Sequence, residues 1–499
     1  MNFRLTMICL QKTTICLFIL ICFICELQAE EVEQGTYTDL TKALQNPLKV
    51  RVLDLSFQKL STLPKEIGQL KNLIELDLNG NQLTTLPSEM GQPKNLQRLY
   101  LQNNQLTTLP KEIGQLKNLQ ELNLNQNQLM TIPYEIGQLG NLRELHFYHN
   151  RFVTLPQGIE QLQKLQKLNL GGNQLATLPK EIEQLQKLEW LTLGNNQITS
   201  LPETIGNLQN LQRLDLNYNQ LTTLPKEIGQ LQKLEWLNLV KNQLRTLPKE
   251  IGQIQNLKVL DLTFNSLTSL PKEMEQLKNL QELYFHHNQF ASLPEEIWKL
   301  QNVQKLILNN IQLRTLPEEI GKFQKLRNLD LSFNRFTILP EKIEELKNLK
   351  ILNLVSNQLT ILPKEIGQLQ KLEDLWLEYN QLKSLPQEIG QLQNLKTLNL
   401  RSNQLATLPN EIGRLRNLRW LDLSHNQLTI LPKEIGQLQN LQELNLNGNR
   451  LTTLPSEIEF LKKLKILRLY QNEFSSEEKE RIQKLLPKCK IDFEYLYGE

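Results

Sequence analysis

Five histidines are the side chains of this sequence best suited to bind a metal ion or to transfer protons. His146 and His149 lie three residues apart, and His286 and His287 are adjacent about 140 residues later. In the repeat arrangement derived below, the two pairs are six units apart, which is roughly 29 Å along a sheet with about 4.8 Å between strands. Zinc ligands must all lie within about 2.0–2.3 Å of one ion. We therefore interpret these residues and His425 as surface polar residues, and we expect no metal site and no cofactor.

Acidic side chains recur with equal regularity, and the sequence has none of the short catalytic motifs. It contains no P-loop, no Gly-x-Ser-x-Gly elbow and no His-Glu-x-x-His. Copies of one repeat residue explain the aspartates better than a catalytic pair does. We expect no enzyme activity, no catalytic residue and no small-molecule substrate. The recurring aspartates are Asp54, Asp77, Asp215, Asp261, Asp330 and Asp422.

The charge and composition exclude further classes of partner. A formal net charge of +3 on 499 residues gives no electrostatic reason to expect a nucleic acid or an anionic membrane. A hydrophobic content of 39% is enough to build a buried core.

Prolines divide most of the chain into units of equal length. Eighteen of the 21 prolines are spaced by 23 residues, from Pro64 to Pro455. Such a period indicates stacked units that contact only their neighbours. With Leu119 as position 1, leucines at positions 4 and 6 alternate as in a strand, the proline at position 15 ends the extended segment, and the spacing of Ile136 and Leu139 suits a helical or 3-10 turn on the outer side. Narrow strands inside and wider turns outside must curve the stack.

Aromatic side chains concentrate on the strand side of these units. Thirteen occupy positions 3, 5, 7 and 8, which we place on the concave wall, whereas Tyr134, Trp298 and Phe460 occupy other surfaces. Strand propensity explains part of this bias. Exposed tryptophan and tyrosine also anchor protein interfaces. We therefore predict that the wall binds a protein partner through Arg401 and through twelve of these aromatic residues, all except Phe57: Tyr100, Tyr148, Trp190, Tyr218, Trp236, Phe264, Tyr284, Phe333, Trp376, Tyr379, Trp420 and Tyr470.

Two groups of these residues are predicted contact patches. The first patch contains Trp190, Trp236, Tyr218 and Phe264. The second patch contains Trp376, Tyr379 and Trp420 together with Phe333, Ile351, Val355 and Arg401.

The pattern Leu-x-x-Leu-x-Leu-x-x-Asn-x-Leu resembles the leucine-rich repeat family over residues 50–474. Its continuation Leu-Pro-x-Glu-Ile-Gly-x-Leu, as in residues 109–116 and 224–231, is most similar to the exported leucine-rich repeat proteins of leptospiral spirochaetes. The resemblance implies an α/β solenoid, a curved horseshoe with a concave parallel β-sheet of about nineteen strands and short helical or 3-10 segments on its convex side. It also implies a cell-surface or secreted setting with a host protein as a plausible partner.

An asparagine follows each predicted strand at position 9 and is expected to form a structural ladder. Its side-chain amide can bond to backbone groups of its own and the adjacent turn that the sheet does not reach. Gln58 and Ile311 replace it in two repeats, and we expect the ladder to be weakest at Ile311, where Asn310 could substitute in part. The ladder is Asn81, Asn104, Asn127, Asn150, Asn173, Asn196, Asn219, Asn242, Asn265, Asn288, Asn334, Asn357, Asn380, Asn403, Asn426, Asn449 and Asn472.

The two ends of the chain differ from the repeats. Residues 1–29 have the charged, apolar and small-residue order of a signal peptide, with cleavage expected after Ala29. Retention of this segment or lipidation at Cys25 is the alternative, and only then do we expect membrane association. Residues 30–49, with a helix over 38–45, and residues 475–499, with a helix over 475–486 and a strand over 489–493, are predicted caps. Cys489 is the one cysteine outside the signal segment, and we expect it to be buried.

These observations predict an exported protein-binding solenoid that is secreted or displayed on the cell surface. Two alternatives stay open. The leucine-rich repeat scaffolds that associate with Ras inside eukaryotic cells are also similar, and an envelope structural protein would use the solenoid for self-association.

Overall fold

We describe the protein from a computed structural model that covers residues 35–290 and 292–494. The predicted signal peptide lies outside the described residues. The chain divides into two compact units, Met1–Asn196 and Gln197–Glu499. No helix within the described part has the length and hydropathy of a membrane span.

The first unit is a parallel sheet in which each strand is followed by a short turn of helix. Every strand from β1 to β7 pairs in parallel with the next strand along the chain, the last of these pairs being β7 with β8. Its strands are β1 (Thr36–Tyr37), β2 (Val52–Asp54), β3 (Glu75–Asp77), β4 (Arg98–Tyr100), β5 (Glu121–Asn123), β6 (Glu144–His146), β7 (Lys167–Asn169) and β8 (Trp190–Thr192). Its helices are α2 (Leu40–Gln45) and the 3-10 helices η1 (Lys65–Gln69), η2 (Ser88–Gly91), η3 (Lys111–Gln115), η4 (Tyr134–Gln138), η5 (Ile159–Gln161) and η6 (Lys180–Gln184).

The second unit continues the same alternation with strands β9 to β21. Its strands are β9 (Arg213–Asp215), β10 (Trp236–Asn238), β11 (Val259–Asp261), β12 (Glu282–Tyr284), β13 (Lys305–Ile307), β14 (Asn328–Asp330), β15 (Ile351–Asn353), β16 (Asp374–Trp376), β17 (Thr397–Asn399), β18 (Trp420–Asp422), β19 (Glu443–Asn445), β20 (Ile466–Arg468) and β21 (Lys490–Asp492). Its helices are η7 (Glu203–Asn207), η8 (Lys226–Gln230), η9 (Lys249–Gln253), η10 (Lys272–Gln276), η11 (Glu295–Lys299), η12 (Glu318–Lys322), η13 (Glu341–Glu345), η14 (Lys364–Gln368), η15 (Gln387–Gln391), η16 (Asn410–Arg414), η17 (Lys433–Gln437), η18 (Ser456–Phe460) and α3 (Ser476–Leu485).

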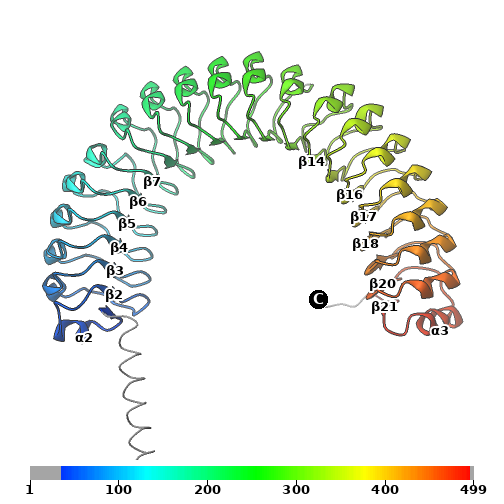
Figure 1. Cartoon of the computed structure of the whole chain (residues 1–499), viewed down its shortest axis with the longest axis horizontal. Helices are drawn as coiled ribbons and strands as arrows, with labels where there is room; N and C mark the ends of the chain where they lie inside the picture. Colours follow the sequence, from blue (N-terminus) through cyan, green and yellow to red (C-terminus); the bar gives the residue numbers. More distant parts are fainter. Residues whose placement is uncertain (1–34, 291, 495–499) are drawn as a thin grey trace, which may run out of the picture. The chain divides into compact units, whose positions relative to one another are not determined.

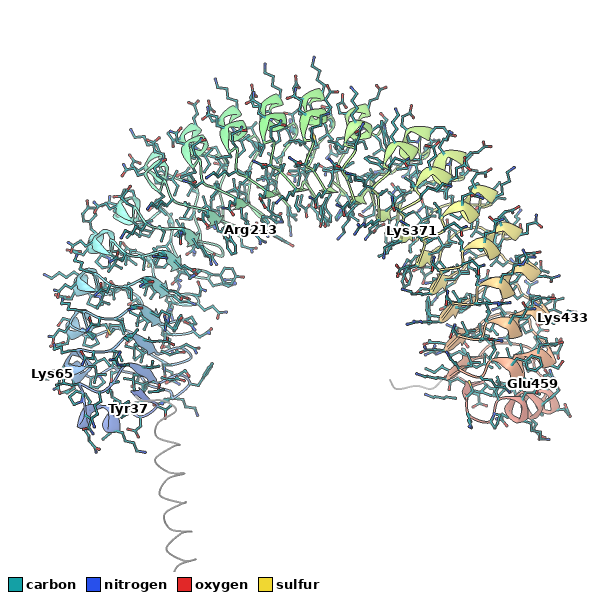
Figure 2. All side chains as sticks on the ribbon, in the orientation of Figure 1. Tyr37, Lys65, Arg213, Lys371, Lys433 and Glu459 are labelled. Carbon is teal, nitrogen blue, oxygen red and sulfur yellow. The ribbon has the colours of Figure 1, made fainter. Side chains whose placement is uncertain are left out.

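Within each unit, the strands line the inner side and the 3-10 helices line the outer side (Figure 1). The leucines at positions 4 and 6, such as Leu122 and Leu124, are fully buried between the two layers. Each 3-10 helix of the common type begins after a proline in extended conformation, for example Pro133 with φ −65°. Lys65 and Lys433 project from the outer side, whereas Arg213 lies on the strand side (Figure 2). The predicted inside strand and outside turn are both present.

The predicted asparagine ladder connects consecutive repeats, because each asparagine side chain bonds to backbone groups of the preceding repeat as well as of its own. The Nδ2 of Asn334 donates to the carbonyls of Leu308, in the preceding repeat, and Leu331 at 2.9 and 3.0 Å. Its Oδ1 accepts the N–H of Leu313 at 3.0 Å. A buried amide that bonds to both repeats therefore holds their turns in register, because an unmatched backbone group there would be penalised.

The ladder lacks its asparagine at Ile311, whose side chain is buried. Asn310 does not replace it, because its Nδ2 lies 2.6 Å from Nε2 of His287 instead. In another repeat, the N–H of Phe336 donates to Oδ1 of the ladder residue Asn357 at 3.1 Å. The N–H of Phe290 occupies the equivalent position, and Ile311 offers it no such acceptor. The expected weakness of this rung stays a prediction.

A second asparagine ladder, which we did not anticipate, runs just before the strands. Asn118 Nδ2 donates to the carbonyl of Lys94 at 2.9 Å, and Asn394 Nδ2 donates to that of Gln370 at 2.7 Å. Where a lysine occupies this position, as at Lys371, its Nζ donates to the asparagine of the preceding repeat, here Asn348, at 2.6 Å. The entry and the exit of the strands are thus both bonded from repeat to repeat.

Short helices lie at both ends of the described chain. Asp39 caps α2 by accepting the N–H of Lys42 at 2.9 Å, and Ala43 is the buried residue of this helix. Ser475 caps α3, which buries Ile482 and Leu486. The predicted helices and final strand are each slightly shorter in the structure. One side chain differs from expectation: Cys489 is half-buried rather than buried. Partial burial raises the pKa of the Cys489 thiol to about 11.

Candidate interaction surface

The predicted binding residues lie on the strands or in the turn directly after them. Positions 3 and 5 are on the strands, as for Trp420 and Trp376, whereas positions 7 and 8 lie beyond the strand end. Each of the thirteen aromatic side chains is half-buried or exposed. We call this surface, made of positions 3, 5, 7 and 8, the strand wall. Its binding role stays a prediction.

Position 8 has left-handed backbone in all nineteen repeats, which sequence reasoning missed. Five aromatic residues adopt it, among them Phe333 with φ 55° and Tyr379 with φ 58°. A bulky side chain in this region is unusual and disfavoured by roughly 1–2 kcal/mol, whereas glycine adopts it readily. Strand propensity explains none of these five, because they lie outside the strands. They are Phe57, Tyr218, Phe264, Phe333 and Tyr379, with side chains 71, 45, 46, 57 and 50% exposed.

The residues of the second patch do come together. The Trp376 and Trp420 rings lie 5.7 Å apart between centroids, across the intervening strand β17. The Arg401 guanidinium lies 5.9 Å from the Tyr379 ring. Ile351 and Val355 line a hollow of about 370 Å³ together with Trp376. Aromatic rings, a cation and a hollow on one face are the features of a protein-contact site.

The residues of the first patch fall in different units. Trp190 is in the first unit, where Lys167 Nζ lies 4.6 Å from its ring centroid. Trp236, Tyr218 and Phe264 are in the second unit. There Arg213 lies 4.0 Å from the Trp236 ring and Lys241 lies 4.7 Å from the Tyr218 ring. Cation–π contacts between neighbouring repeats thus hold the rings of Trp190, Trp236 and Tyr218 on the wall. The sequence spacing did not predict these contacts.

Comparison with known proteins agrees with this architecture. Models described as leucine-rich repeat region match residues 23–151, 95–188, 134–214, 226–335, 295–381 and 410–486, and a leucine rich repeat model matches residues 186–244 and 370–428. The chain belongs to the leucine-rich repeat family. A search of curated proteins finds no match.

Solved leucine-rich repeat structures resemble the chain over most of its length. A leucine-rich repeat protein of Leptospira interrogans is 48% identical, with 92% of this chain and 100% of that chain covered and a TM-score of 0.63. YopM from Yersinia enterocolitica is 28% identical, with coverage of 87% and 90% and a TM-score of 0.61. The plant peptide hormone receptor RGFR1, solved in complex with RGF2, is 30% identical, with coverage of 88% and 81% and a TM-score of 0.64. The predicted family and fold class are confirmed.

The aspartates at position 5 of the leucine-rich repeats have a structural task. Asp261 Oδ1 accepts the N–H of Thr263 at 3.0 Å, and Asn353 makes the same bond to Val355 at 3.1 Å. Twelve repeats show this bond, which satisfies a backbone donor where the strand ends. Burial raises the pKa of Asp215 and of Asp261. The recurrence predicted from repeat copying therefore has a physical reason.

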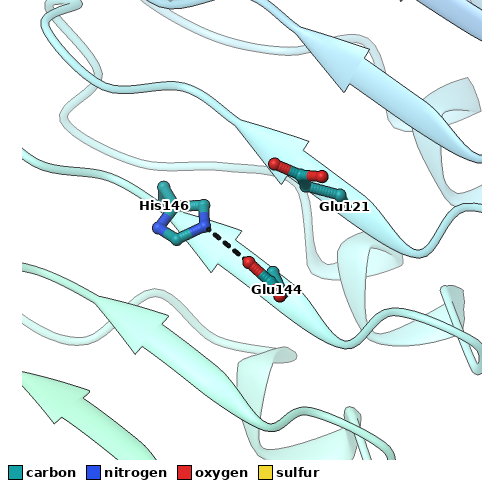
Figure 3. A group of neighbouring side chains, drawn as sticks. All are labelled: Glu121, Glu144 and His146. Atoms are coloured by element: carbon teal, nitrogen blue, oxygen red, sulfur yellow. Dashed lines mark ion pairs between the residues drawn. The ribbon is translucent and has the colours of Figure 1, made fainter.

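One histidine joins two carboxylates on the strand wall of the first unit (Figure 3). The potential ligand atoms of Glu121, Glu144 and His146 all lie within 4.8 Å of one another. His146 Nε2 is 3.5 Å from one Glu144 oxygen, and Lys167 Nζ is 2.9 Å from the other. Three such ligands could hold a divalent cation. The Lys167 ammonium already neutralises Glu144 there, and together with His146 it lowers the pKa of that carboxyl despite its burial. We considered histidine pairs alone in the sequence and so missed this mixed group.

The outer side of the second unit has one irregular repeat, which corrects a prediction. Trp298 occupies the repeat position that is glycine in many other repeats, for example Gly436. A Cβ on Gly436 would lie 2.2 Å from the carbonyl oxygen of Glu457, so that repeat has no room for a side chain there. The Trp298 ring is 5% exposed and packs 5.6 Å from the Phe323 ring, so Trp298 is a core residue rather than the surface residue we expected. A hollow of about 610 Å³ lies beside it, between η11 and η12. Charges of both signs line that hollow, and it has no aromatic patch comparable with the strand wall.

Proposed function

We propose that this protein is exported and binds a protein partner, with a host protein as the expected target, through the second patch of its strand wall. The carrying observation is the exposed Tyr379 and Phe333 in left-handed backbone beside the Trp376–Trp420 pair. Because this backbone angle occurs at position 8 of every repeat, it is the bulky aromatic side chains placed there, rather than the angle itself, that call for a functional reason. These aromatic rings are not required for the buried core of the repeats, for the bonding of its backbone donors or for the caps.

Known relatives support a binding function rather than a catalytic one. The plant receptor RGFR1 was solved with RGF2, and the Arabidopsis receptor kinase HAESA was solved with the peptide hormone IDA and the co-receptor SERK1. Export is supported by the charged, apolar and small-residue order of residues 1–29.

The binding proposal is tested by affinity capture from host material with residues 30–499 as bait. The bait is compared with a Trp376→Ala/Trp420→Ala double variant and with Phe460→Ala, which removes an aromatic side chain that is 52% exposed on η18. We expect a partner that the double variant loses and that Phe460→Ala retains. Equal capture by all three folded baits overturns the assignment to the second patch.

The export proposal is tested separately by cell fractionation and N-terminal peptide mass spectrometry. A mature chain that begins at Glu30 supports export with cleavage. Recovery of Met1 from the cytoplasmic fraction favours the intracellular scaffold instead, and an acylated Cys25 indicates a lipid anchor.

A further inference from the structure

The hollow in the second patch combines an apolar floor with two carboxyl groups. It spans strands β13 to β16, and Ile307, Ile351, Val355 and the ring of Trp376 supply its apolar lining. Ile307 is 9% exposed, which places it at the base of the hollow. A long side chain with a charged tip can pack its stem against such a surface.

Neither carboxyl group of the hollow forms an ion pair with a lysine or an arginine among the described residues. Glu378 Oε2 is shielded from solvent and has no hydrogen-bond partner among the described residues. Burial, with Asp422 nearby, raises the pKa of this carboxyl. Asp330 takes the N–H and the hydroxyl of Ser332, at 2.9 and 2.7 Å, both on Oδ1. The described residues therefore leave Asp330 Oδ2 without a bond.

Two cations of this region, Lys305 and Arg401, form cation–π contacts with rings that do not line the hollow. Lys305 lines the rim, but its Nζ lies 5.0 Å from the ring of Tyr284 on β12, on the side away from Trp376. The Arg401 guanidinium lies 5.9 Å from the Tyr379 ring. Its charge lowers the pKa of Glu378, but burial and Asp422 outweigh it and the pKa is raised. The hollow thus presents an apolar surface and unmatched negative charge together, and its complement is a cationic side chain with an apolar stem.

We propose that this hollow receives an arginine side chain of the protein partner. Its methylene stem packs on Ile351 and Val355, its guanidinium stacks on Trp376, and its N–H groups donate to Asp330 Oδ2 and the Glu378 carboxylate. Arginine fits better than lysine because its planar group both stacks on aromatic rings and presents several donors to carboxylates. This inference rests on the proposed function and names the chemistry that the second patch recognises.

The test uses small probes on the purified full chain, with methyl NMR signals of Ile307, Ile351 and Val355 as the readout. The probes are N-acetyl-arginine amide, N-acetyl-lysine amide and the uncharged isostere N-acetyl-citrulline amide. We expect saturable shifts with the arginine probe and affinity at least about tenfold weaker for citrulline, since hydrogen bonds to charged groups are the stronger kind. Equal binding of citrulline overturns the proposal, and equal binding of lysine overturns the choice of arginine.

Two variants and one matched control test whether the carboxyl groups of Glu378 and Asp330 bind the arginine probe. Glu378→Gln and Asp330→Asn should each weaken the arginine probe about fivefold or more. Asn is a native residue at position 5, where Asn353 keeps the strand-end bond, so Asp330→Asn preserves the fold. Asp261→Asn makes the same change three repeats away, outside the hollow, and should have no effect. Loss of binding in Asp261→Asn, or none in the other two, overturns the proposal. If the probe fails while the Trp376→Ala/Trp420→Ala bait still loses its partner, the proposed function stands and the arginine assignment falls.

Discussion

The indole rings of Trp376 and Trp420 pack against each other at 41° between their planes, although one ends β16 and the other begins β18. Both are half-buried and reach over the strand that separates them. Their contact fixes two large apolar surfaces in one place before any partner arrives, which reduces the ordering that binding requires.

Mutation of this pair should reveal its coupling. Aromatic pairs contribute about 0.5–1.5 kcal/mol beyond the area that they bury, so Trp376→Ala and Trp420→Ala should be non-additive by that amount in the free energy of unfolding. Urea denaturation of the single and double variants measures it. Trp376→Ala combined with Trp236→Ala, on the distant strand β10, should be additive. Additivity in the first pair would show that the rings do not stabilise each other.

Glycine at a strained aromatic position should stabilise the fold. Phe333 has φ 55° and its side chain is 57% exposed, so Phe333→Gly relieves backbone strain and removes little buried surface. We expect a gain of up to about 1 kcal/mol, since the greater freedom of glycine in the unfolded chain offsets part of the relief. Phe333→Val, which keeps a side chain in the left-handed region, should instead destabilise. The thermal midpoints of the two variants decide the matter, and an equal loss in both contradicts the prediction.

Restoring the missing rung should protect its neighbourhood from hydrogen exchange. Ile311→Asn supplies the acceptor that Phe290 N–H lacks, and its amide exchange should slow about tenfold, as one net hydrogen bond implies. In Asn334→Ala, exchange at Leu313, which donates to Asn334 in the native protein at 3.0 Å, should become faster. Unchanged exchange at Phe290 in Ile311→Asn would mean that this repeat satisfies its donor in another way.

Acid should weaken the repeat that contains His286. Burial first, and then His287, lower the pKa of His286 from 6.5 to about 4, whereas Asp330 opposes the shift. Between these values the unfolded state binds more protons than the folded state, so stability falls as the pH drops from about 6.5 to 4 and is unaffected above that range. Exchange protection of the β12 amides at about pH 7 and pH 5, corrected for intrinsic rates, measures this. His286→Asn, which introduces the residue found at the same position at 217 and 309, should reduce the loss, and the remainder is expected from His287, whose pKa is also lowered by burial. An undiminished loss in His286→Asn would assign the effect to another group.

The periodic features of the fold were predictable because they repeat. The buried Leu122 and Leu124, the proline before each 3-10 helix and the ladder from Asn81 to Asn472 all follow from residues that recur every 23 positions. Pattern alone therefore predicted the strand side and the nineteen strands from β2 to β20.

The irregular features were not predictable in the same way. Trp298 looked like a surface residue because its position is polar or glycine elsewhere, and its burial against Phe323 depends on that neighbour also being larger than the usual leucine. The left-handed turn was hidden because position 8 carries side chains of every type, so no residue preference marks it. The hollow beside Trp376 depends on how side chains from four strands pack, which spacing along the chain does not specify.

The left-handed turn residue has a consequence for how this surface changes over generations. The hydrogen bonds of the backbone before and after this residue impose its positive φ. Its side chain belongs neither to the core nor to the asparagine ladders. Tyr379, Ser402 and His425 occupy this place in consecutive repeats with φ between 53 and 58°. We expect substitutions at these nineteen places to alter recognition while leaving the scaffold intact, so that new binding specificities can arise one residue at a time.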